Sequence, residues 1–135
     1  MAHSQDYDTL TGLTANSTGL ATSQFLAVKL ASTAGKVVLA GALNTTTVAA
    51  AYVGILQNAP GANEEAEVAF SGICKMMVAT STIAIADRVG VNSTSKGTDA
   101  GATDNGAFIA RALQASGAPN DIITVDLAGN GGRRY

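Results

Sequence analysis

The sequence predicts a mainly β protein, a small β-barrel or β-sandwich of short strands with a flexible N-terminal arm. Three observations favour this fold class. Apolar and polar residues alternate with a period of two in several short segments. Turns rich in Gly, Pro and Asn, such as residues 60–63, separate those segments. The chain has 135 residues and no tryptophan, so we expect one domain with a core of Val, Ile, Leu and Ala.

The N-terminal residues differ in composition from the rest of the chain. Residues 1–20 are rich in Ser, Thr, Gly, Asp and Asn, with isolated leucines. We interpret them as a flexible arm that orders on a partner surface, and we expect the chain to fold without them but to bind more weakly. Residues 21–129 then form a single β-domain, and residues 130–135 form a C-terminal tail.

The clearest strand is predicted over residues 67–78, where Val68, Cys74 and Met76 share one face. Gly72 interrupts the pattern and indicates a bulge or bend. Six further segments have the same character: 24–30, 36–40, 51–57, 83–91, 107–114 and 122–128.

Two segments do not follow the strand pattern. Alanine is frequent in residues 47–51 and in parts of 27–34, which allows one short helix there. Residues 92–106 contain no large apolar side chain, so we expect a long exposed loop that is either functional or disordered.

The chain also carries an internal repeat. When the sequence is laid on itself with an offset of 57 residues, Leu56-Gln57 falls on Leu113-Gln114 and Val68 falls on Val125. This match predicts two related hairpins, at about 51–72 and 108–129. The alternative is that any two hairpins with alternating patterns look alike.

The residues needed for common catalytic chemistry are scarce. The single imidazole, His3, lies in the expected arm, so a Ser-His-Asp or Cys-His arrangement cannot be built on a rigid frame. A zinc site needs three or four Cys and His ligands, whereas the chain has one of each. Cys74 alternates with apolar neighbours, and we interpret it as a small core residue rather than a nucleophile.

Acidic and glycine-rich segments have equally ordinary explanations. We interpret Glu64, Glu65 and Glu67 as a solvated hairpin turn, although the three carboxylates could bind a cation. Asp99 and Asp104 lack the ligand spacing of a calcium loop. We therefore expect no catalytic, cofactor-binding or metal-binding residues, no cofactor and no enzymatic activity.

Charge limits the partners that we expect. Charged residues make up 13% of the chain and its net charge is -2, without a basic stripe that could bind nucleic acid. No apolar stretch approaches the roughly 20 residues that span a bilayer, so we expect no membrane association. The N-terminus lacks the pattern of a signal peptide, so we expect synthesis in a cytoplasm.

Four segments in order resemble one family. They are the strand Tyr52-Val-Gly-Ile-Leu56, the hairpin strand Glu67-Val-Ala-Phe-Ser-Gly72, the segment from Ile83 to Val89 and the closing residues 107–129. Together they resemble the bacteriophage capsid decoration, or cement, proteins, formerly a phage family of unknown function. Ala86 stands where this family usually has glycine before Asp87, and Arg111 stands where a small residue is common.

The resemblance implies a structural virion protein. Members of this family bind the outer surface of the major capsid protein in many copies, commonly as homotrimers, and stabilise the shell. A different structural role is left open, namely a head fibre, spike or receptor-binding module that uses residues 92–106. A third alternative is a β-barrel that binds a small ligand, although we expect no small-molecule substrate.

Overall fold

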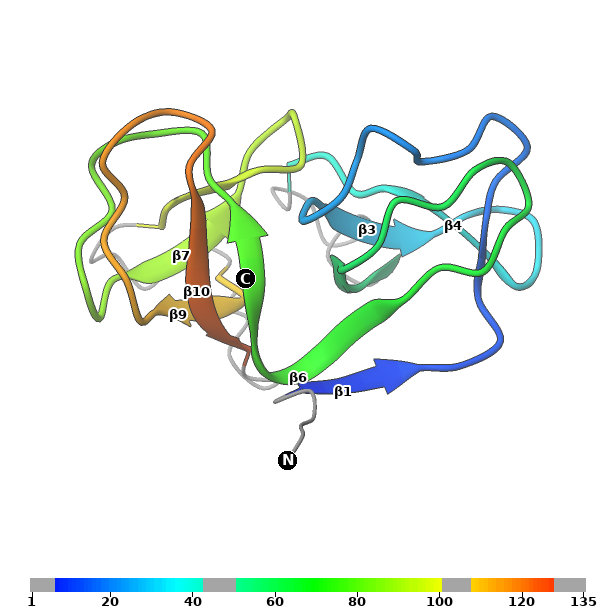
Figure 1. The fold of residues 1–135 in the computed structure, drawn as a ribbon, viewed down its shortest axis with the longest axis horizontal. Helices are drawn as coiled ribbons and strands as arrows, with labels where there is room; N and C mark the ends of the chain where they lie inside the picture. The colour runs from blue at the N-terminus through cyan, green and yellow to red at the C-terminus, as the bar shows by residue number, and fades with distance from the viewer. Residues whose placement is uncertain (1–6, 43–50, 101–107, 128–135) are drawn as a thin grey trace.

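The computed structural model describes residues 7–42, 51–100 and 108–127, which form a ten-stranded and mainly antiparallel sheet (Figure 1). The strands are β1 (Tyr7–Leu10), β2 (Thr14–Ala15), β3 (Ala27–Leu30), β4 (Lys36–Leu39), β5 (Tyr52–Leu56), β6 (Val68–Met77), β7 (Arg88–Val91), β8 (Gly97–Asp99), β9 (Ala110–Ala112) and β10 (Ile122–Leu127). Their order is β2-β4-β3-β5-β6-β10-β9-β7-β8, and β1 pairs with β6 outside this path. The mainly β fold class is therefore confirmed, and the sheet is not closed.

The long strand β6 connects the two halves of the molecule. Its first part pairs with β5 and β1, and its second part pairs with β10. Figure 1 shows the strand bending sharply beside β1, so that its two parts belong to different halves of the molecule. Gly72 lies between the two parts with a φ of 91°, a left-handed conformation that glycine adopts without steric cost.

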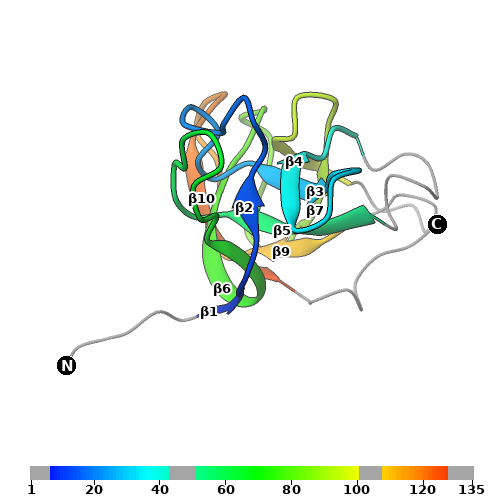
Figure 2. The ribbon, with the colours of Figure 1, turned by 90° about the vertical axis from the view of Figure 1, so that its right-hand side faces the viewer.

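The strands form two units with the same connectivity. The N-terminal unit, residues 7–72, contains neighbours in the order β4-β3-β5-β6, and the C-terminal unit, residues 72–127, contains them in the order β8-β7-β9-β10. Each unit also has a short parallel contact to the strand at the start of that order. Ala15 pairs with Val37 of β4, and Val78 pairs with Gly97 of β8. Figure 2 looks onto the N-terminal unit, where β2 lies beside β4.

Backbone geometry repeats between the units at matching positions. Phe25 before β3 and Ala86 before β7 have positive φ values of 70° and 78°. The backbone N–H of Phe25 donates to Leu56 O, and that of Ala86 donates to Ala112 O, at 2.7 and 2.8 Å. The chain therefore enters β3 and β7 through the same uncommon turn.

The two predicted hairpin segments are antiparallel pairs, β5–β6 and β9–β10. Asn63 and Asn120, which lie at the turns, have φ values of 61° and 71°. Lys36 Nζ donates to Asn63 Oδ1 at 2.9 Å, and Lys96 Nζ donates to Asn120 Oδ1 at 2.6 Å. The similarity of the units thus extends beyond the hairpins. It includes β4 with its first residue, Lys36, and β8 with the residue before it, Lys96.

Two clusters of buried side chains form the core. The cluster inside the N-terminal unit consists of Ala15, Leu20, Val28, Val37, Leu56, Ala66 and Val68. The larger cluster fills the C-terminal unit and includes Cys74, Met76, Val89 and Val125. It also includes a row of cross-strand neighbours from the outer face of the N-terminal unit, Ala27, Ile55 and Ala69, all 0% exposed. We call these three residues the Ile55 row; they pack the first unit against the second.

The arm prediction must be corrected for residues 7–20. Tyr7–Leu10 forms β1 on the edge of β6, and Thr14–Ala15 forms β2. Ala15 and Leu20 are buried in the core of the N-terminal unit. The prediction was wrong because few apolar side chains anchor this segment. Backbone hydrogen bonds to neighbouring strands hold it in place, and the composition does not reveal them. Residues 1–6 and the expected tail, 130–135, lie outside the described residues.

The loop prediction and one part of the helix prediction also need correction. Ala27–Leu30 is strand β3 rather than helix, because tertiary packing overrides the helical preference of alanine. Within the expected loop, Gly97–Asp99 forms β8, and Ser95 and Gly97 are buried. Ala51, the last residue of the other alanine-rich segment, is helical. Residues 47–50 and 101–106, on which these two predictions also fall, lie outside the described residues.

Candidate binding surfaces

Cys74 is part of the packed core. It is 4% exposed, and burial raises the pKa of its thiol to about 12, with a smaller contribution from the negative charge of Asp126. A thiol with this pKa holds its proton at neutral pH and is a poor nucleophile. The geometry agrees with the interpretation of Cys74 as a packing residue.

The structure describes only some of the other candidate residues. His3 and Asp104 lie outside the described residues, and Asp99 is at the exposed end of β8. Among residues 7–42, 51–100 and 108–127, no group of three or more His, Cys, Asp or Glu side chains could hold a metal ion.

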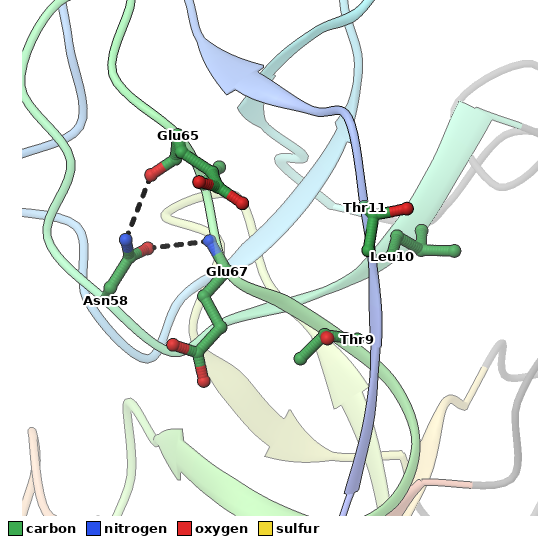
Figure 3. Close-up of a pocket in the computed structure, with 7 residues that line it drawn as sticks. Thr9, Leu10, Thr11, Asn58, Glu65 and Glu67 are labelled. Carbon is green, nitrogen blue, oxygen red and sulfur yellow. Dashed lines mark hydrogen bonds between the residues drawn. The ribbon is translucent and has the colours of Figure 1, made fainter.

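The acidic cluster lies in the turn and first residues of the hairpin that leads into β6. Glu64 Oε1 accepts a hydrogen bond from the backbone N–H of Gly61 at 2.6 Å, so this carboxylate stabilises the turn. Glu65 and Glu67 line a hollow of about 320 Å³ together with Thr9, Leu10, Thr11, Asn58 and Ala66 (Figure 3). Sequence reasoning does not reveal this hollow, because it places residues 9–11 in a flexible arm.

Asn58 holds the two sides of the acidic hairpin together. Its amide nitrogen donates to Glu65 O at 3.0 Å, and its Oδ1 accepts from the backbone N–H of Glu67 at 2.9 Å, as Figure 3 shows. The Tyr7 hydroxyl donates to Glu67 Oε2. Burial, followed by this hydrogen bond, raises the pKa of Tyr7 to about 12. The hollow is therefore lined by hydrogen-bond acceptors, with the exposed Glu65 carboxylate as its most accessible charge.

A second surface lies on the outside of the C-terminal unit. It carries three of the six exposed large apolar side chains in the described part of the chain: Ile73 (42% exposed), Leu113 (42%) and Ile122 (43%). Ile73 lies on β6, Ile122 on β10, and Leu113 follows β9. We call this surface the β9–β10–β6 face.

Polar side chains lie between the three apolar residues of this face. Lys75 Nζ donates to Thr124 Oγ1 at 2.8 Å, across the β6–β10 pair. The Gln114 Oε1 atom accepts from the Thr124 backbone N–H at 3.1 Å. Asp126 pairs in register with Ile73 on one side and with Arg111 on the other. The face therefore combines apolar contact area with three charged side chains.

Comparisons with known proteins give no relative: no family model matches the chain, and no curated protein matches it. Within the part of the chain that the structure describes, no helix is long and apolar enough to cross a membrane.

Proposed function

We propose that this chain is a structural virion protein that decorates the outer surface of a bacteriophage capsid, binds the major capsid protein and stabilises the shell. In this proposal the protein works by binding as a homotrimer, without turnover of a substrate. A low share of charged residues, 13%, suits a surface that packs against other proteins in many copies.

The observation that carries the proposal is the structural role of the family-like motifs. Gly54, the glycine of the Tyr52–Leu56 strand, faces β6: a Cβ there would collide with the carbonyl oxygen of Ala69 and lie 2.8 Å from Val68 Cγ1. Gly72, the glycine of the hairpin strand, has the positive φ at the bend of β6. Each motif glycine thus occupies a position where this fold requires glycine, which favours a shared fold rather than a chance match.

Ala86 gives a further argument for the resemblance. It stands where the family usually has glycine, and its φ of 78° lies in the left-handed region that glycine favours. The departure from the family pattern is therefore a substitution that retains the backbone conformation. This supports placing the chain in a family whose members decorate capsids.

The experiment that tests the proposal is co-sedimentation. Shells of the virus that encodes this chain, stripped of the protein, are mixed with the purified chain and pelleted. We expect saturable binding that approaches the number of shell subunits, together with a higher melting temperature of the shell. A chain that stays in the supernatant at all concentrations would contradict the proposal.

A further inference from the structure

The two units present matching rows of residues to different surroundings. In the N-terminal unit, the Ile55 row is fully buried against the C-terminal unit. In the C-terminal unit, the corresponding cross-strand neighbours on β7, β9 and β10 are Arg88, Arg111 and Asp126. Arg111 and Asp126 are exposed. The same part of the fold is therefore an interface in one unit and an open surface in the other.

Several features distinguish this open surface from ordinary solvent-facing sheet. The row of charged residues continues through Asp126 to Ile73 on β6, one of the three apolar side chains of the β9–β10–β6 face. Exposed apolar side chains set among polar ones are typical of protein–protein contact surfaces. Two arginines, Arg88 and Arg111, lie directly opposite each other in register, an arrangement that usually destabilises a sheet.

We infer that the β9–β10–β6 face is the surface through which the chain docks on the shell protein. The inference rests on the proposed function and names the surface that carries it out. This surface replaces residues 1–20 as the expected docking segment, because residues 7–20 contribute strands and buried side chains to the N-terminal unit.

The chemistry of the face defines its partner. Ile73, Leu113 and Ile122 need an apolar polypeptide surface, whereas nucleic acid would need a denser set of cations. Lys75 and Arg111 add two positive charges to one negative charge from Asp126, so the face is positive on a chain with a net charge of -2. We therefore assign it to an apolar patch of the shell protein that carries carboxylates.

The polar residues of the face have a second consequence. Lys75 and Arg111 each make one hydrogen bond, to Thr124 Oγ1 and to Ala86 O at 2.9 Å, and both remain exposed. Charged residues keep the face hydrated before docking. An apolar row such as the Ile55 row would not be hydrated in this way. A surface that must first be exposed and later be covered needs this mixture.

The test compares two triple variants that remove equal numbers of exposed apolar side chains. The face variant is Ile73→Thr/Leu113→Thr/Ile122→Thr. The control variant removes the other three exposed large apolar side chains of the described residues, Leu30→Thr/Leu39→Thr/Ile85→Thr. Threonine is polar and favourable in strands, and thermal unfolding checks that each variant folds. Binding is measured by co-sedimentation with the stripped shells.

We expect the face variant to bind at least about tenfold more weakly than the natural chain and the control variant to bind within about threefold of it. Equal binding by the face variant and the natural chain would overturn the inference while leaving the decoration role intact. Absence of binding by the natural chain would instead reject the decoration role.

A second variant keeps the inference testable if the face variant does not fold. The change Lys75→Ala/Arg111→Ala removes the two exposed cations and leaves the apolar residues in place. We expect weaker binding with a smaller dependence on salt concentration, because charge pairs to shell carboxylates are lost. An unchanged affinity and salt dependence would overturn the assignment of this face.

Discussion

At the scale of single residues, backbone geometry explains several choices that side-chain chemistry does not. Gly54 sits in β5 where β6 approaches most closely, and Ala86 holds a left-handed conformation at the entry to β7. Sequence reasoning marks such positions only as glycines or alanines in a strand pattern. Their importance comes from neighbours that are distant in the chain.

Replacing Gly54 by alanine should strongly destabilise the protein. The added Cβ would meet backbone atoms of Ala69, which cannot move without disturbing the β5–β6 pair. We expect a loss of about 3 kcal/mol in the free energy of unfolding, measured by urea denaturation. The control is Gly117→Ala, where the nearest atom is the Asp121 carboxylate oxygen at 3.5 Å; a similar loss in both variants would contradict this explanation.

Replacing Ala86 by glycine should have the opposite effect. Glycine removes the cost of a left-handed conformation, which exceeds the entropy that it adds to the unfolded chain. We expect a gain of about 0.5–1 kcal/mol, again from urea denaturation. Ala84→Gly, two residues earlier and without a positive φ, should give no gain. Lower stability of the Ala86→Gly variant would show that the turn does not store this strain.

Buried Cys74 should make the protein sensitive to alkaline pH. The pKa of the thiol is raised from 9.0 to about 12 by burial, so the folded state holds this proton more tightly than the unfolded state. The resulting stabilisation is complete below about pH 9 and is lost as the pH rises toward 12. Tyr7, with its pKa raised from 10.0 to about 12, acts in the same direction.

The measurement is the urea midpoint of the natural chain and of Cys74→Ala at neutral and alkaline pH. Cys74→Ala should be less stable near neutral pH because it leaves a small cavity, but its midpoint should fall less as the pH rises. Identical pH dependence of the two proteins would contradict a buried neutral thiol.

At the scale of elements, the period-two pattern was sufficient for seven strands and insufficient for three. Segments with buried alternating residues, such as Val68–Met77 and Ile122–Leu127, were located correctly from the sequence. The missed strands β1, β2 and β8 are two to four residues long, and backbone pairing with neighbours holds them in place. A local pattern cannot reveal pairing of that kind.

The position of β1 and β2 leads to a prediction about truncation. Removing residues 1–20 would delete both strands together with the buried side chains of Ala15 and Leu20. We expect this truncated chain to lose its cooperative thermal transition. Removal of residues 1–6 alone retains every one of these contacts and should leave a folded protein. A cooperative transition in the longer truncation would restore the arm interpretation.

The hollow beside β1 shows why candidate sites are harder to predict than strands. Its lining residues come from 9–11 and from 58–67, segments that are joined by the β1–β6 pair and by the bridge between Thr14 and Glu65. The β9–β10–β6 face likewise joins residues that lie up to 53 positions apart, from Ile73 to Asp126, in register across the sheet. Sequence reasoning places the acidic residues in a hairpin turn. It does not predict that residues 9–11 lie beside them or that β9, β10 and β6 are neighbours.

At the scale of the whole molecule, the chain consists of two units of the same connectivity joined through one bent strand. The gapless offset of 57 residues matches β6 with β10 correctly but places β5 one residue out on β9, because the hydrogen bonds of the fold equate Leu56 with Ala112 rather than with Leu113. The spacing also changes along the chain: Phe25 and Ala86 lie 61 residues apart, whereas Asn63 and Asn120 lie 57 apart. Insertions between strands therefore concealed the β3–β4 and β7–β8 correspondence. The fold explains how one row of residues is buried within the chain while its counterpart, with Arg111 and Asp126, is exposed.

The most direct test of the decoration role is the copy number of this chain in purified particles of the virus that encodes it. Quantitative mass spectrometry gives its ratio to the major capsid protein. The account predicts a ratio near one copy per shell subunit, as expected for a protein that covers a symmetric lattice. A ratio limited to the few copies of a vertex or tail component, or the absence of the chain from the particle, would contradict it.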